Sequence, residues 1–187
     1  MVLYINACVR KESRTNRIVE CLLEKLGGEY EEVKLSERSL KPLSEEMLIK
    51  RTQLMEKGLF SDPMFDLARQ FQQAEQIVIA APFWDLSFPS ILKIYMENIY
   101  VIGLVSEYGA DGTPHGLCRA EKLYYVTTAG GAYVPDFSYD YIRSLSCDYF
   151  GIRKTELIMA EMLDVVGYDE ETIVEQKIKD IQERGNA

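Results

Sequence analysis

Short apolar runs alternate along the chain with longer stretches in which apolar residues recur at helical spacing. The short runs, which are typical of β-strands, lie at residues 2–7, 30–35, 76–81, 122–128 and 156–160. The longer stretches, which are typical of helices, lie at residues 14–26, 45–57, 62–74, 89–100 and 170–181. We expect Asp62 and Pro63 to open the third of these helices, and Ser87 and Pro89 to open the fourth.

Strands that alternate with helices predict an α/β fold with a parallel sheet and crossover helices. We expect a doubly wound five-stranded parallel sheet of order 2-1-3-4-5 with helices on both faces, and a single domain over residues 1–187. The run at 76–81 is apolar almost throughout and is predicted to lie in mid-sheet, whereas the alternating run at 30–35 is typical of an edge strand. Such a sheet binds its ligands at the carboxyl ends of strands 1, 3 and 4.

The composition indicates which binding partners and which cellular compartment are compatible with the chain. A formal net charge of −9 disfavours binding to nucleic acid or to an anionic membrane surface. No apolar stretch approaches the roughly 18 residues of a membrane span, and the apolar run at 2–7 lacks the preceding positive charges of a signal peptide. The four cysteines are widely spaced and there is one histidine, which disfavours a zinc site and fits a cytoplasmic protein with reduced thiols.

The loop after the first strand is rich in groups that bind anions. It carries Arg10, Ser13, Arg14, Thr15 and Asn16 at the point where the next helix begins. The free N–H groups and positive dipole end of a helix start attract phosphate, and hydroxyl and guanidinium groups add donors. The sequence therefore predicts a phosphate site here, although a helix start with its ordinary Ser/Thr cap would show a similar pattern.

The loop after the third strand is aromatic. It contains Pro82, Phe83, Trp84, Asp85 and Leu86, and Trp84 is the only tryptophan in the chain. Aromatic side chains at a switch point of the sheet can cover a flat conjugated ring. The alternatives are a small hydrophobic cluster under the loop and a contact between two copies of the chain.

The loop after the fourth strand can present backbone N–H groups to a ligand. It contains Thr128, Ala129, Gly130, Gly131 and Tyr133, and the paired glycines allow a ligand to approach the backbone closely. A glycine pair by itself is also typical of a simple turn. Together, the three loops predict a site for a phosphorylated, flat cofactor.

These segments also carry a resemblance. The opening strand and its Ser/Thr loop, the segment IVIAAPFWDLSFPSILKIYMENI at 77–99, the hairpin-like segment at 108–122 and TTAGG at 127–131 resemble the flavodoxin-like family of NAD(P)H:quinone reductases. The similarity is greatest to the bacterial FMN-dependent NADH azoreductases and spans nearly the whole chain. It departs from the family at Cys8, where serine is frequent, and at Asp85, where asparagine is common.

The resemblance implies a flavodoxin-like fold, FMN as cofactor, and NADH or NADPH as co-substrate. It implies phosphate contacts from residues 13–16 and ring contacts from residues 83–86 and 128–131. It further implies ping-pong transfer of hydride through the flavin to a small-molecule acceptor such as a quinone, azo compound or nitroaromatic. Family members are usually homodimers with the flavin at the subunit interface. The resemblance implies no catalytic side chain; Tyr133 and His115 lie on segments near the expected site, and neither receives a catalytic role.

Two other functions remain open at this point. Cys8, Arg14 and Thr15 satisfy the C-x5-R-[ST] phosphate loop of low-molecular-weight tyrosine phosphatases, in which a thiolate attacks phosphorus. The loop lacks the expected glycine, and the chain lacks a late Asp-Pro general acid. A flavodoxin-type electron carrier is the second alternative, although the segment at 108–122 and the aromatic loop favour a substrate pocket.

Overall fold

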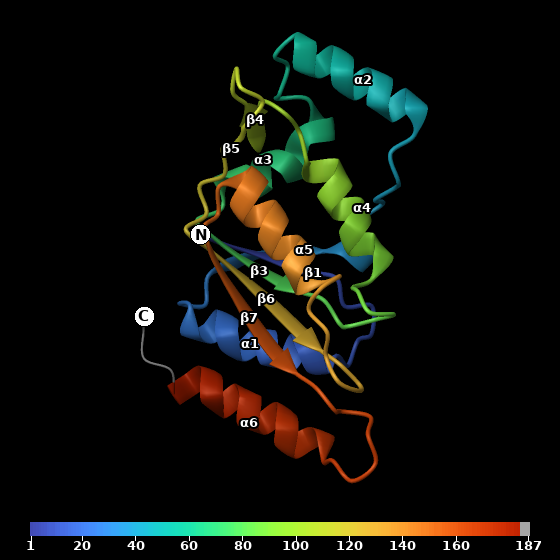
Figure 1. The fold of residues 1–187 in the computed structure, drawn as a ribbon, viewed down its shortest axis with the longest axis vertical. Coiled ribbons are helices and arrows are strands. Elements are labelled where there is room, and N and C mark those ends of the chain that lie inside the picture. Colours follow the sequence, from blue (N-terminus) through green and yellow to red (C-terminus); the bar gives the residue numbers. More distant parts are fainter. Residues whose placement is uncertain (184–187) are drawn as a thin grey trace.

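A computed structural model describes residues 1–183 and contains one central sheet of parallel strands (Figure 1). The strands are β1 (Val2–Asn6), β2 (Tyr30–Lys34), β3 (Gln76–Ala80), β6 (Lys122–Thr128) and β7 (Lys154–Ala160). Their spatial order is β2-β1-β3-β6-β7, and each neighbouring pair is parallel. The predicted doubly wound sheet of order 2-1-3-4-5 is therefore confirmed, with β3 in the middle and β2 at an edge.

Helices cover both faces of the sheet. In Figure 1, α1 (Arg14–Lys25) and α6 (Glu170–Glu183) lie side by side on one face. The other face carries α3 (Asp66–Gln73), α4 (Ser90–Ile99) and α5 (Tyr139–Ser144). Helix α2 (Glu45–Glu56) lies farther out at the top of the figure and has no fully buried residue.

Two apolar layers, one on each face of the sheet, explain why β3 is apolar almost throughout. Ile77 and Ile79 pack into the layer under α3, α4 and α5, whereas Val78 and Ala80 pack into the layer under α1 and α6. Since successive side chains of a strand point to opposite faces, a strand covered on both faces needs apolar residues at every position.

The structure corrects three details of the expected elements. Residues 62–74 form a 3-10 turn (Pro63–Phe65) followed by α3, although Asp62 does cap the turn by accepting a hydrogen bond from Met64 N. Ser87 does not cap α4, because its hydroxyl donates to Phe137 O and the helix begins after Pro89 with no side-chain cap. The pattern also missed α5 and the π-helical turn that follows it, Leu145–Phe150.

The segment expected to form a hairpin does so outside the main sheet. Strands β4 (Ser106–Tyr108) and β5 (Pro114–Gly116) pair antiparallel, and Figure 1 shows them away from the carboxyl ends of the sheet strands. His115 lies on β5, opposite Glu107, and is exposed. Within residues 1–183, no helix is both long enough and apolar enough to cross a membrane.

Candidate functional site

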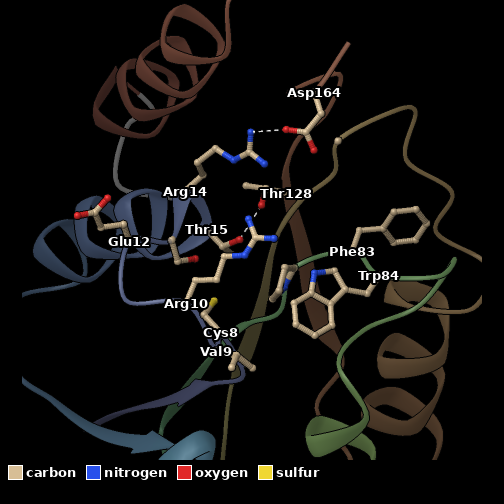
Figure 2. A pocket seen from close by; sticks show the side chains of 13 residues that line it. Cys8, Val9, Arg10, Glu12, Arg14, Thr15, Phe83, Trp84, Thr128 and Asp164 are labelled. Atoms are coloured by element: carbon tan, nitrogen blue, oxygen red, sulfur yellow. Dashed lines mark hydrogen bonds and ion pairs between the residues drawn. The ribbon is translucent and has the colours of Figure 1, made fainter.

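The loops after β1, β3 and β6 meet at one cleft of about 130 Å³ (Figure 2). All three follow strands that end at the same edge of the sheet, beside the point where the strand order reverses. The residues that line the cleft are Cys8, Val9, Arg10, Glu12, Ser13, Arg14, Thr15, Pro82, Phe83, Trp84, Thr128, Gly130 and Asp164.

The start of α1 supplies hydrogen-bond donors to the cleft. Ser13 is the N-cap, and its hydroxyl accepts from Asn16 N at 3.3 Å. The buried hydroxyl of Thr15 lies 2.7 Å from that of Thr128, which joins the helix start to the end of β6 (Figure 2). In the part of the chain that the structure describes, no partner is recorded for the backbone N–H groups of residues 9–15. An anion would find unpaired donors here.

Asn16 has a different place from the one expected. Its side-chain oxygen accepts a hydrogen bond from Tyr4 OH at 3.0 Å, and the residue lines an outer groove rather than the cleft. Its amide therefore holds the helix start against β1.

Cys8 lies at the floor of the cleft and is 2% exposed. Its backbone N–H donates to Asn6 Oδ1 at 2.9 Å, which fixes the loop as it leaves β1. Burial raises the pKa of the Cys8 thiol to about 11, despite hydrogen bonds with Ser13 and Thr15 that favour the thiolate. A thiol with this pKa stays neutral near pH 7, so Cys8 is poorly suited to be a phosphatase nucleophile.

The side chain of Arg14 points toward Asp164 and pairs with it (Figure 2). Its Nη1 lies 2.8 Å from Asp164 Oδ1 and 2.6 Å from Glu170 Oε2, and it also donates to Leu163 O at 3.3 Å. A hydrogen bond from Arg14 lowers the pKa of Asp164. The guanidinium that a phosphatase would aim at a phosphoryl group is thus held by two acidic residues.

Trp84 forms the aromatic edge of the cleft and is 42% exposed. Trp84 and Ser87 exchange backbone hydrogen bonds of 3.0 and 2.8 Å around Asp85 and Leu86. Both of these central residues have positive φ, 49° and 66°, as a tight two-residue hairpin turn requires. Left-handed backbone at Leu86 costs about 1 kcal/mol or more, and such strain is typical of functional loops. The turn projects Asp85 and Leu86 to its exposed tip, so neither lines the cleft.

Tyr133 packs against the aromatic loop through Phe83. Its ring packs against Phe83 in an edge-to-face contact, with 4.9 Å between ring centroids. The Tyr133 hydroxyl lies 3.0 Å from Ser138 Oγ, and burial raises the Tyr133 pKa. Tyr133 does not line the cleft, so its direct role here is to hold Phe83.

The glycine-containing loop after β6 is pinned to the loop after β7. Ala129 is buried and its N–H donates to Ala160 O at 2.9 Å, while Ala129 O and Gly130 O accept from Leu163 N and Asp164 N. A Cβ on Gly130 would collide with the Asp164 carboxylate, whereas one on Gly131 would meet open space. Within residues 1–183, the N–H groups of Gly130 and Gly131 have no recorded partner and remain potential donors.

The acidic residues at and beside the cleft, Asp164, Glu12 and Glu170, are not apparent from the sequence. Asp164 follows β7 and reaches the cleft through a turn in which Met162 has a φ of 66°. The one sequence signal for Asp164 is that it follows β7, the strand next to β6, and so lies near the edge of the sheet where the cleft forms. Isolated acidic residues are common in a chain with this net charge, so Asp164 does not stand out in the sequence. The same holds for Glu12 and for Glu170, the first residue of α6.

Comparison with known proteins agrees with this architecture. The flavodoxin-like fold family matches residues 1–184, which is nearly the whole chain. The chain belongs to this family. An FMN-dependent NADH:quinone oxidoreductase 2 of Clostridium acetobutylicum is 35% identical, over 98% of this chain and 96% of that protein. An FMN-dependent NADH:quinone oxidoreductase of Coprothermobacter proteolyticus is 30% identical, over 97% of this chain and 96% of that protein.

Solved structures with the same flavodoxin-like fold include an azoreductase of Bacillus anthracis, with a TM-score of 0.82 and 21% identity over 96% of this chain and 95% of that chain. An FMN-dependent NADH-azoreductase of Bacillus anthracis, solved in complex with FMN, has a TM-score of 0.81 and 20% identity over 97% and 95% of the two chains. At these identities the likeness concerns the fold.

Proposed function

We propose that the chain is an FMN-dependent oxidoreductase that takes reducing equivalents from NADH and passes them to a quinone or azo acceptor. The observation that carries this is the convergence of an anion-binding helix start and an exposed tryptophan at the switch point of the sheet. Relatives that match almost the whole chain are named FMN-dependent NADH:quinone oxidoreductases, which supports the same function.

The donors of the cleft fit the phosphate of FMN. Ser13, Thr15 and the unpaired N–H groups of residues 9–15 surround the start of α1, and Figure 2 shows Arg10 reaching over the same space. We assign Arg14 to this set through its backbone N–H, since its side chain is paired elsewhere.

The flavin ring belongs at the aromatic edge. The cleft, at about 130 Å³, is smaller than the roughly 300–1,000 Å³ typical of cofactor pockets, so it suits the phosphate end. The ring would then lie beside Phe83, Trp84 and the N–H groups of Gly130 and Gly131. When bound, FMN supplies the hydride chemistry, and this chain binds it, orients it and leaves a face open to substrates.

We also propose that the chain forms a homodimer that completes this open site. The aromatic loop and the segment that it contacts through the Ser87–Phe137 hydrogen bond carry apolar side chains that are exposed in one chain: Trp84 at 42%, Leu86 at 54% and Phe137 at 64%. Exposed apolar patches of this kind favour contact with another molecule. We retain a single domain and a cytoplasmic location as proposals, supported by the shared central sheet and by the four free cysteines.

The two alternatives are not favoured. The phosphatase reaction needs a thiolate and a free guanidinium, whereas burial keeps the Cys8 thiol neutral and Arg14 is paired with Asp164 and Glu170. A bare electron carrier would not need a hydride donor site, and relatives of the chain are named as NADH-linked enzymes.

Steady-state kinetics test the proposal. The FMN-loaded protein is assayed for NADH oxidation with a benzoquinone and, separately, with an azo dye, while both substrates are varied. We expect turnover without a partner reductase and parallel double-reciprocal lines, because one site serves both substrates in turn. Flavin-loaded protein that turns over only when a separate reductase is added would instead be an electron carrier.

A further inference from the structure

Arg14 is held in a bracket made of Asp164 and Glu170, which we call the carboxylate bracket. Its Nη1 contacts Asp164 Oδ1 at 2.8 Å and Glu170 Oε2 at 2.6 Å, and 27% of the Arg14 side chain is exposed. These contacts join the start of α1 to the loop after β7, which holds Asp164, and to Glu170, the first residue of α6. The arginine of the expected phosphate loop is therefore already paired with anions.

The backbone fixes Asp164 in this place. Asp164 N donates to Gly130 O at 2.8 Å, and the Asp164 side chain lies against Gly130 in the space that a Cβ would fill. Met162, with its positive φ, turns the chain toward the cleft just before Asp164. Asp164 lines the cleft together with Ser13 and Thr15, so its carboxylate borders the same space as these two residues.

The charges of the bracket oppose an incoming phosphate. One guanidinium and two carboxylates give this cluster a net charge of −1, whereas an unbracketed Arg14 would contribute +1. A phosphate dianion that enters the cleft meets favourable donors at the start of α1 and an unfavourable carboxylate at Asp164. An unphosphorylated flavin would not feel this repulsion.

We propose that Asp164, acting with Glu170, is a specificity-determining residue. The two carboxylates hold the Arg14 side chain away from the cofactor phosphate. They thereby reduce the preference of the protein for FMN over unphosphorylated flavin. The inference rests on the proposed function, since it concerns the same cleft. Its consequence is an exchangeable cofactor: FMN is held less tightly than the donors around α1 would allow.

The test is the ratio of two dissociation constants. FMN and riboflavin, which lacks the phosphate, are each titrated at low salt into the flavin-free protein and into Asp164→Asn, with flavin fluorescence as the signal. One charge removed near a dianion predicts that Kd(riboflavin)/Kd(FMN) rises about 3- to 10-fold in the variant, with riboflavin binding almost unchanged. The rise shrinks as salt is added, because the interaction is electrostatic.

A matched control exists one position beyond Glu170. Glu171 pairs with Arg17 on the outer side of the same helix start, so Glu171→Gln removes the same charge without touching Arg14. We expect Glu170→Gln to raise the ratio and Glu171→Gln to leave it within about twofold. The Glu170 variant also answers the question if Asp164→Asn does not fold.

The outcomes separate the two claims. A ratio that stays the same or falls in both Asp164→Asn and Glu170→Gln, while the wild type binds FMN, would overturn the bracket but leave the proposed function intact. An equal rise in Glu171→Gln would overturn it as well, since the effect would then be one of general charge. A wild type that binds neither flavin would refute the proposed function and the bracket together.

Discussion

Gly130 and Gly131 are neighbours, yet the structure predicts opposite results for alanine at the two positions. A Cβ on Gly130 would collide with the Asp164 carboxylate and lie 3.0 Å from Asp164 Cγ and 3.2 Å from Asp164 Cβ. A Cβ on Gly131 has nothing within 4 Å. Neither glycine is among the residues with positive φ, so backbone strain does not enter the comparison.

The magnitude follows from how firmly Asp164 is held. Its N–H is bonded to Gly130 O, and its carboxylate is paired with Arg14, so the side chain has to leave the ion pair or the two loops have to separate. Overpacking of this kind costs about 1–3 kcal/mol. We expect Gly130→Ala to lower the free energy of unfolding by this amount, and Gly131→Ala to be neutral or to raise it by up to about 1 kcal/mol.

Urea denaturation of the flavin-free protein gives these free energies without the contribution of bound cofactor. Thermal scans should agree, since about 1 kcal/mol corresponds to about 2–4 °C in Tm for a chain of this size. In an Asp164→Ala background, the cost of Gly130→Ala should fall by about 1 kcal/mol or more, as expected for residues in contact. Equal costs at the two glycines, or an unchanged cost in that background, would refute the assigned contact.

Three further predictions concern the cleft. Ser13→Ala combined with Thr15→Ala should weaken FMN binding by about 1–3 kcal/mol through loss of two hydroxyl donors, and an unchanged affinity in a calorimetric titration would remove the phosphate site. FMN should strongly quench the fluorescence of Trp84, the only tryptophan, and unquenched emission at saturation would place the flavin elsewhere. Cys8, with a pKa of about 11, should react slowly with iodoacetamide at pH 7 and faster toward pH 11, and the more exposed Cys147 should react first. Rapid labelling of Cys8 at pH 7, detected by mass spectrometry, would contradict its burial.

The sheet and the three loops were predictable because each depends on a local pattern. Apolar runs bounded by polar segments mark β1, β3 and β6, and alternating strands and helices leave few topologies open. Once the order is known, the carboxyl ends of these strands have to meet. The structure therefore brings the helix start, the aromatic loop and the loop after β6 together. Of the residues expected there, Asn16, Asp85, Leu86, Ala129, Gly131 and Tyr133 do not line the cleft itself.

The remaining features depend on contacts between distant segments. Helix α5 is short and rich in tyrosine, and it continues into a π-helical turn, so it shows no clear helical period. Asp164 and Arg14 are 150 positions apart, and nothing near either residue signals the pairing. Gly130 leaves space that the Asp164 side chain occupies, and no residue near Gly130 in the sequence indicates this contact.

The proposed oxidoreductase activity is tested most simply by the visible spectrum of the protein after loading with FMN, desalting and anaerobic addition of NADH. We expect the flavin band to stay with the protein, NADH to bleach it, and a quinone to restore it. Protein that emerges colourless from desalting and does not bind FMN in titration, or a bound flavin that NADH does not bleach, would contradict the proposed oxidoreductase.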